Sequence, residues 1–403
     1  MADHKERDHA LLSPSAAHRW MICTPSAQLE AQFPDTTSSA AAEGTLAHEI
    51  CEIKARQKFF VQKTDLGFMA KNVATRELNK LRKDPLFQEE MEGFCDDYVE
   101  ELDLHRMSFM ERPHIALETK LDLTDWIPEG YGTADCIMIG GNKLLVADFK
   151  YGKGVKVSAE NNPQMQLYAL GAWKKFSLLY QIERVVMMII QPRLSVNPEI
   201  WEESIEDLLV FGEAVKSRSQ LAATGEGEFC PGEEQCRFCR ARERCRARAD
   251  ENIAMAFGPA GKMPPLITDE EVGEYLQRGS DVAKWLKDLE MYALRSCLDG
   301  KEIPGYKAVE GRGSRDWTDQ DAAFKALEQS GVPEAMMYER RPLTLAALEK
   351  VVGKKAFAEA VGEYIVKTPG KPALVPESDK RPAITSVETA FREVPETEDL
   401  PFC

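Results

Sequence analysis

The sequence predicts an α/β protein in which a mixed sheet is flanked by helices and followed by a smaller, mainly helical C-terminal domain. Three observations support this fold class. Residues 136–149 read as a hairpin, because two apolar runs are joined by Gly140-Gly141-Asn142 and glycine tolerates positive φ. Residues 184–191 form a continuous apolar run, which fits a strand buried on both faces. Stretches with helical spacing of apolar residues surround these strands.

Helices and one strand are predicted before the hairpin. Proline after Ser13 favours a helix start, because its missing N–H costs no hydrogen bond there. A later helix has its apolar residues on one side and His48 on another. A stretch in which apolar and polar residues alternate then marks a strand. In chain order these elements are a short helical segment over 16–22, a helix over 42–58, two helices over 68–108 that break near Asp84-Pro85, and a strand over 114–121.

Helices dominate the sequence after the hairpin. Pro163 is expected at the first position of a helix in which Gln164 and Tyr168 lie one turn apart on the same side. The predicted elements are a helix over 162–176, the buried strand over 184–191, a helical region over 199–222, a long amphipathic helix over about 268–298, and small helices over 318–367.

A Gly- and Pro-rich stretch divides the chain. Residues 258–266 contain two glycines and three prolines, which is typical of a linker. We therefore expect a domain over residues 1–257, a linker over 258–266, and an α-rich domain over 267–403 that ends in an extended acidic tail.

The composition is that of a globular protein with an excess of acid. The 403 residues carry a net charge of −16, which argues against a non-specific nucleic-acid binder. Six arginines nevertheless crowd into a dozen residues and predict a local basic lane: Arg237, Arg240, Arg242, Arg244, Arg246 and Arg248. No apolar run approaches the length of a membrane span, and the N-terminus lacks a signal-peptide apolar region. We expect a cytoplasmic protein that does not bind membranes.

Two aspartates and a lysine in the hairpin are candidates for chemistry. Period-two alternation puts Asp148 and Lys150 on the same face of their strand, and Asp135 lies on the neighbouring strand. The two carboxylates could hold one divalent cation beside the lysine ammonium, an arrangement that activates water and polarises a phosphodiester. The alternative interpretation is a solvated sheet edge with no ligand.

Four short patterns follow one another along the chain. They are G-x-x-x-H from Gly44 to His48, G-x-A-D from Gly132 to Asp135, D-x-K from Asp148 to Lys150, and Q-x-x-x-Y from Gln164 to Tyr168. Over roughly residues 10–250, this order resembles the RecB-type branch of the PD-(D/E)XK nucleases. The closest resemblance is to phage-borne members of domain-of-unknown-function families, and a more distant one is to CRISPR-associated and helicase–nuclease proteins. The resemblance implies a restriction-endonuclease-like core with an αβββαβ arrangement.

The resemblance also implies a role for each motif residue. Asp135, Asp148, the carbonyl of Phe149 and His48 would bind Mg²⁺ or Mn²⁺, and the imidazole would favour Mn²⁺. Lys150 would orient the attacking water or stabilise charge on the phosphorane. The remaining catalytic candidates, Gln164 and Tyr168, would contact the scissile strand or brace Lys150. Glu49 and Glu118 lie near the motifs. We expect them at most to contact the metal ligands and not to bind the metal themselves.

Four of the ten cysteines cluster in a polar, arginine-rich segment. Because that segment offers no apolar core, they predict a metal site with two alternatives. Cys230, Cys236, Cys239 and Cys245 could hold a structural Zn²⁺. The last three could instead join Cys23 in holding a [4Fe–4S] cluster. The resemblance favours the cluster, because iron–sulfur nucleases of this group use one cysteine before the first motif and three after the last.

Together these features predict a metal-dependent DNA nuclease. We expect an exonuclease that acts on DNA ends or single strands in phage or prophage recombination or replication, in the bacterial host cytoplasm if the protein is phage-encoded. The sequence lacks a G-x-x-x-x-G-K-[ST] motif, so unwinding would come from a separate helicase, and a phage recombination or single-strand-binding protein is a further candidate partner. The alternatives are a non-catalytic DNA- or partner-binding module of the same fold, and a zinc-stabilised adaptor protein.

Overall fold

The computed structural model describes residues 10–34, 39–257, 268–310, 318–330 and 343–361, together with 333, 337, 338, 364 and 365. The chain forms two compact units, Met1–Val309 and Glu310–Cys403. The predicted linker over 258–266 and the acidic tail lie outside the described residues.

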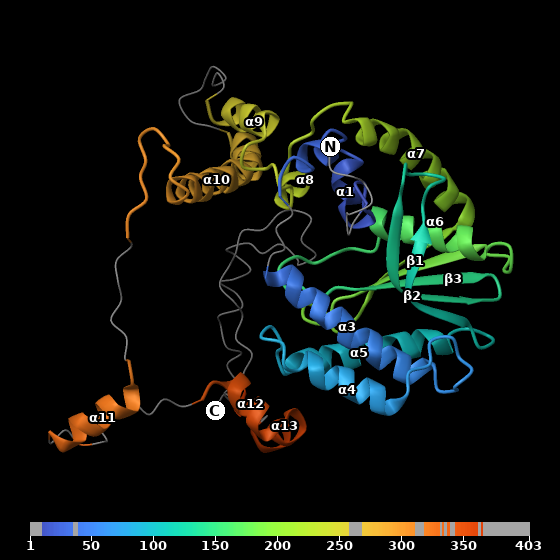
Figure 1. Cartoon of the computed structure of the whole chain (residues 1–403), viewed down its shortest axis with the longest axis horizontal. Coiled ribbons are helices and arrows are strands. Elements are labelled where there is room, and N and C mark those ends of the chain that lie inside the picture. Colours follow the sequence, from blue (N-terminus) through green and yellow to red (C-terminus); the bar gives the residue numbers. More distant parts are fainter. Residues whose placement is uncertain are drawn as a thin grey trace, which may run out of the picture. The chain divides into compact units, whose positions relative to one another are not determined.

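The first unit is built on one five-stranded mixed sheet, as predicted for an α/β protein (Figure 1). The strands lie side by side in sequence order. β3 and β4 run parallel, and every other neighbouring pair is antiparallel. The strands are β1 (His114–Asp122), β2 (Tyr131–Gly140), β3 (Lys143–Phe149), β4 (Arg184–Ile190) and β5 (Glu199–Ser204).

Strand β5 was not predicted from the sequence. Residues 199–222 were expected to be helical throughout, but the first six pair with β4 as an antiparallel edge strand. The helix begins only after Ser204, whose side chain accepts a hydrogen bond from the N–H of Asp207 and caps it. Pairing with the apolar strand β4 therefore overrides the local sequence, which shows no clear alternation.

Helices cover both faces of the sheet (Figure 1). On one face, α3 and α5 bury side chains such as Ile50 and Tyr98 against the sheet, and α4 packs on α3. On the other face, α6 and α7 bury Leu170 and Leu208 together with Trp20 of the N-terminal segment. The helices are α3 (Ser39–Phe59), α4 (Lys71–Leu81), α5 (Glu90–Met107), α6 (Pro163–Phe176) and α7 (Ile205–Thr224).

Short helices of the N-terminal segment and of the segment that follows α7 lie beside each other (Figure 1). The N-terminal segment contains η2 (Pro14–Ala16), α1 (Ala17–Trp20) and α2 (Ser26–Glu30), and α1 contacts α8 (Glu233–Arg237). Helix α9 (Arg246–Phe257) packs against α10 (Asp269–Leu298). We expected α10 in the C-terminal domain, but the contacts group it with the N-terminal unit.

The second unit is helical in its described residues. These form α11 (Gln320–Gln329), α12 (Leu345–Val352) and α13 (Lys354–Val361), and α12 contacts α13. Within the described ranges of both units, no helix combines the length and the apolar character that crossing a bilayer requires.

Candidate functional site

The candidate site begins where the pairing of β2 and β3 stops. The ladder between them ends at Cys136 and Ala147, whereas β3 remains paired with β4 up to Phe149. The N–H of Phe149 donates instead to Oδ2 of Asp135, at 2.7 Å. A side chain thus replaces the backbone acceptor of the neighbouring strand, which fixes the carboxylate of Asp135 at the end of the ladder.

Three potential ligands meet at this position. One ligand atom each from His48 on α3, Glu118 on β1 and Asp135 on β2 lie within 4.8 Å of one another. His48 Nδ1 is 3.4 Å from Asp135 Oδ2. An imidazole nitrogen with two carboxylate oxygens is a suitable ligand set for a divalent cation such as Mn²⁺. The three residues therefore form a candidate metal centre.

Glu118 reaches this centre from an unusual backbone conformation. Its φ of 45° lies in the left-handed region, which residues other than glycine rarely adopt. Its neighbours Leu117 and Thr119 pair with Cys136 and Ala134, so Glu118 stands opposite Asp135. Strained backbone in the middle of a strand is often found at functional sites, and here it coincides with a carboxylate at the candidate metal centre.

The charges at the metal centre are mutually dependent. Burial disfavours the charge on His48, but the neighbouring carboxylate of Asp135 raises the pKa of His48 to about 9. Burial, together with the negative charge of Asp135, raises the pKa of Glu118 to about 8. Without a cation, a proton on each of these groups therefore balances the negative charge, and a cation that binds here displaces both protons.

A second polar group lies next to the metal centre. Lys150 Nζ is 3.0 Å from Asp148 Oδ2 and donates to Gln164 Oε1 at 3.1 Å. Gln164 Nε2 lies 3.2 Å from both Asp148 Oδ1 and Tyr168 Oη. Asp148 and Lys150 thus point to the same side of β3, as the alternation predicted. Gln164 braces both residues, which is one of the two roles expected for it.

Gly132 of β2 lies against Tyr168, which is one turn after Gln164 on α6. A Cβ atom at Gly132 would lie 2.9 Å from Cε1 of Tyr168 and 2.8 Å from Cγ of Pro14. Only glycine leaves room for these contacts, so Gly132 allows α6 and the N-terminal segment to approach β2. A Cβ atom at Gly44 would meet nothing within 4 Å, so packing does not explain that glycine.

The structure groups the predicted ligands differently from the sequence interpretation. We expected Asp135, Asp148 and His48 around one cation, with Glu118 behind them. Within the described residues, the group of ligand atoms within 4.8 Å contains Glu118 and does not include Asp148. Asp148 is nevertheless close to the metal centre. Burial and the negative charge of Asp135 both raise the pKa of Asp148, and the positive charge of Lys150 opposes them. The register of β1 against β2, which the sequence does not reveal, places Glu118 next to Asp135.

Four of the cysteines line a single cavity. Cys23 from the N-terminal segment lines it together with Cys236, Cys239 and Cys245. The nine cysteines among the described residues all carry free thiols. Burial raises the pKa of Cys23 and raises that of Cys239 to about 12. Cys230 is exposed and is not among the residues that line the cavity.

Polar contacts hold the N-terminal segment against the cysteine segment. Glu30, which is buried, accepts hydrogen bonds from Arg19 Nε and from the N–H of Arg240, both at 2.8 Å. Thr24 donates to the carbonyl of Glu226 at 2.6 Å. Cys23 is therefore held beside cysteines that follow it by more than 200 residues.

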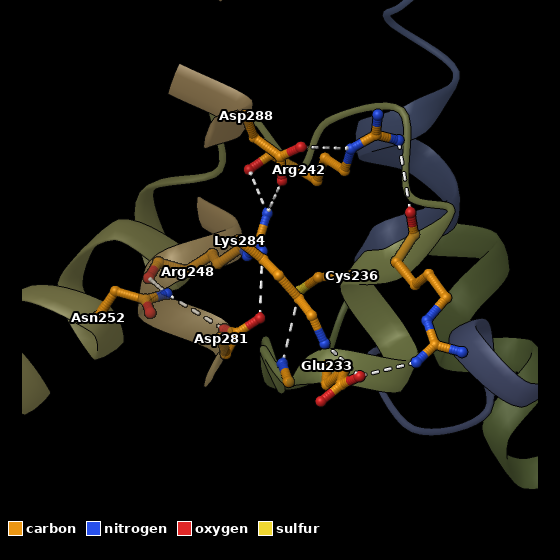
Figure 2. A network of polar contacts seen from close by, with 10 residues as sticks. Glu233, Cys236, Arg242, Arg248, Asn252, Asp281, Lys284 and Asp288 are labelled. Atoms are coloured by element: carbon orange, nitrogen blue, oxygen red, sulfur yellow. Dashed lines mark hydrogen bonds and ion pairs between the residues drawn. The ribbon is translucent and has the colours of Figure 1, made fainter. Parts of the chain in front are cut away.

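Two arginines of the predicted basic lane are used inside the fold (Figure 2). Arg248 has a side chain that is 3% exposed, and it binds Asp288 Oδ2 at 2.6 Å and Asp281 Oδ1 at 3.1 Å. Arg242 binds the other oxygen of Asp288 at 3.2 Å. These two residues of the predicted local basic lane are therefore neutralised by acidic residues of α10.

The buried arginine gives the first testable prediction. Arg248→Ala is expected to lower the free energy of unfolding by about 3 kcal/mol, because Asp281 and Asp288 would lose their buried partner. Urea denaturation measures this change. Arg278→Ala is the matched control, since Arg278 also bridges α9 and α10 but is 45% exposed, and we expect it to cost less than about 1 kcal/mol. Equal effects of the two substitutions would contradict a structural role for Arg248.

Comparisons with known proteins place the chain in a family. The solved structure titled "Crystal structure of SSO0001" is similar over 49% of this chain and 96% of its own, with 13% sequence identity and a TM-score of 0.24. A family model described as "Protein of unknown function (DUF2800)" matches residues 9–382, in agreement with the expected similarity to domain-of-unknown-function proteins. The chain therefore belongs to the DUF2800 family.

Proposed function

We propose that this protein is a metal-dependent DNA nuclease with a PD-(D/E)XK-type core. The observation that carries the proposal is the juxtaposition of two polar groups, one from α3, β1 and β2 and the other from the end of β3. His48, Glu118 and Asp135 offer three ligands within 4.8 Å of one another, and Asp148 with Lys150 stands next to them. This set comes from the four sequence patterns that resemble RecB-type nucleases, with Glu118 as an addition.

Each residue has a role in phosphodiester hydrolysis. A divalent cation at His48, Glu118 and Asp135, with the carbonyl of Phe149 as a further oxygen, would polarise the phosphate and lower the pKa of a bound water. Lys150, which Asp148 and Gln164 hold in place, donates to the attacking water or to the charged phosphate oxygens. Tyr168 positions Gln164 through its hydroxyl. The imidazole ligand favours Mn²⁺ over Mg²⁺.

The proposed substrate is DNA, at its ends or as single strands. A role in phage or prophage recombination or replication follows from the resemblance, and a separate helicase or recombination protein would supply the strands. The test is an assay of purified protein with Mn²⁺ on end-labelled single-stranded and double-stranded DNA. Cleavage that chelation abolishes is the expected result. Binding without cleavage in Mn²⁺ and in Mg²⁺ would instead indicate a non-catalytic module.

We also propose that Cys23, Cys236, Cys239 and Cys245 hold a [4Fe–4S] cluster. Cys23 lines one cavity with Cys236, Cys239 and Cys245, and Cys230 is not among its lining residues. This grouping supports the cluster over a zinc site made of the four local cysteines, and it matches the layout that the resemblance implies. The cluster would join the two ends of the nuclease domain and needs no redox function.

The ligand that the sequence did not identify can be tested separately. Glu118→Gln is expected to weaken Mn²⁺ binding by about 10- to 100-fold, because an amide oxygen replaces a charged ligand. Titration calorimetry of the purified variant measures the affinity without relying on activity. Glu49→Gln is the matched control, since Glu49 is exposed next to His48 but does not belong to the group of three. Unchanged Mn²⁺ affinity in Glu118→Gln would remove this residue from the metal centre.

A further inference from the structure

A cavity connects the proposed catalytic residues with the cysteine segment. Lys150 and Gln164 line it together with Arg237 and Phe238. Its volume is about 510 Å³, within the range of roughly 300–1,000 Å³ that accommodates small-molecule ligands. One or two unstacked nucleotides fit a space of this size, whereas a base-paired duplex does not.

One wall of the cavity is fixed by a buried glutamine. The side chain of Gln191 accepts from the N–H of Val157 at 3.2 Å and donates to the carbonyls of Gly152 and Val155, both at 2.8 Å. Gln191 is 7% exposed, so these hydrogen bonds are shielded from water. These three hydrogen bonds tie the loop that follows the D-x-K pattern to the end of β4.

The walls combine charged side chains of both signs with an exposed aromatic ring. Lys150, Lys156 and Arg237 line the cavity together with Glu160 and Glu234, and the three cations form ion pairs with Asp148, Glu199 and Glu233. Phe238 is 61% exposed, although phenylalanine is usually buried. Aromatic rings beside cationic side chains are the elements with which proteins bind single-stranded nucleic acid, because every base can stack on a ring.

The positive charge does not extend along the whole surface. A second cavity shares His18, Asn161, Pro163 and Glu234 with the first one. Its far side is lined by acidic residues that repel phosphate groups: Glu202, Glu203 and Asp207. Of these two cavities, only the one that adjoins Lys150 is lined by lysine and arginine side chains, which favours a phosphate there.

We propose that this cavity is a nucleotide subsite in which Phe238 stacks on an unpaired base next to the scissile phosphate. The proposal rests on the proposed nuclease function and specifies how that site recognises its strand. Lys156 and Arg237 contact the backbone of the same nucleotide, and the cysteine segment thereby contributes directly to substrate binding. Phe238 is thus a binding residue whose removal acts on single strands and leaves the catalytic groups in place.

Binding without catalysis tests the subsite. Fluorescence anisotropy with fluorescein-labelled oligothymidylate in EDTA measures affinity in the absence of cleavage. Phe238→Ala is expected to weaken binding about tenfold, because one base–aromatic contact is lost, and Phe238→Trp is expected to retain wild-type affinity. Affinity for a blunt duplex of the same length should not change. Tyr306→Ala is the control, since Tyr306 is 74% exposed and lies outside both cavities.

The outcomes separate the subsite from the proposed nuclease function. Wild-type protein that cleaves DNA, with Phe238→Ala binding oligothymidylate as tightly as wild type, would refute the subsite and leave the nuclease intact. A wild-type protein that binds through Phe238 but does not cleave with Mn²⁺ would refute the nuclease alone. Equal weakening of duplex and single-strand binding in Phe238→Ala would also contradict stacking on an unpaired base.

Discussion

Replacing Asp135 with asparagine is expected to lower the rate of Mn²⁺-dependent DNA cleavage by at least about 10³-fold. The substitution removes the charge of a carboxylate that lies between His48 and Glu118 in the candidate metal centre. An amide oxygen can still accept the hydrogen bond from the N–H of Phe149, so the end of β3 keeps its structure. Single-turnover cleavage of a labelled oligonucleotide measures the rate, and circular dichroism checks the fold.

Two further variants make this result specific. Asp122→Asn makes the same change in a carboxylate whose side chain is 58% exposed and bound to Lys174 on the surface, so cleavage should be unaffected. Lys150→Ala should abolish cleavage while Mn²⁺ binding persists, because Lys150 is not a ligand. Wild-type cleavage by Asp135→Asn would remove the metal centre from the mechanism, and wild-type cleavage by Lys150→Ala would remove the lysine.

The parts of the fold that depend on local pattern could be predicted from the sequence. Alternation along β3 put Asp148 and Lys150 on one side, and the two side chains are in contact. The apolar run of β4 is buried from Val185 to Ile190. Asn162 and Pro163 begin α6 as expected, and the Asn162 side chain accepts from the N–H groups of Gln164 and Met165. In each case the determining interactions lie within a few residues of sequence.

The features that the sequence did not reveal depend on contacts between distant segments. Glu118 enters the metal centre because β1 pairs with β2 in one register and because its own φ is positive. Arg248, which the sequence predicts in a basic lane, is bound instead by Asp281 and Asp288 on α10. Neither relation leaves a periodic signal, because each joins elements that are separated by a loop and brought together by packing.

The arginine contacts also change how the cysteine segment is understood. Arg242 and Arg248 are bound to α10 (Figure 2). Arg237 and Phe238, in contrast, line the cavity beside Lys150. The segment thus has one side that stabilises the fold and another that faces the proposed substrate. A cluster held by its cysteines would position both sides at once, which links the proposed cofactor to the proposed binding site.

Replacing Cys23 with serine is expected to remove the proposed cluster and to cause the largest loss of stability among these variants. Protein purified anaerobically should be brown in the wild type and colourless in Cys23→Ser. The cluster would cross-link Cys23 to cysteines more than 200 residues away, and closing such a loop stabilises a fold by up to about 5 kcal/mol when treated like a disulfide. Iron analysis and visible absorption measure the loss of the cluster, and urea denaturation measures the loss of stability.

The matched control is the cysteine that decides between the two proposed metals. Cys230→Ser should stay brown and keep wild-type stability, because Cys230 is exposed and does not line the cavity. If zinc were the native metal, the wild type would be colourless with one Zn²⁺ per chain, and Cys230→Ser would lose it while Cys23→Ser would not. The pair of substitutions therefore tests which thiolates bind the metal, because a cluster depends on Cys23 and a local zinc site on Cys230.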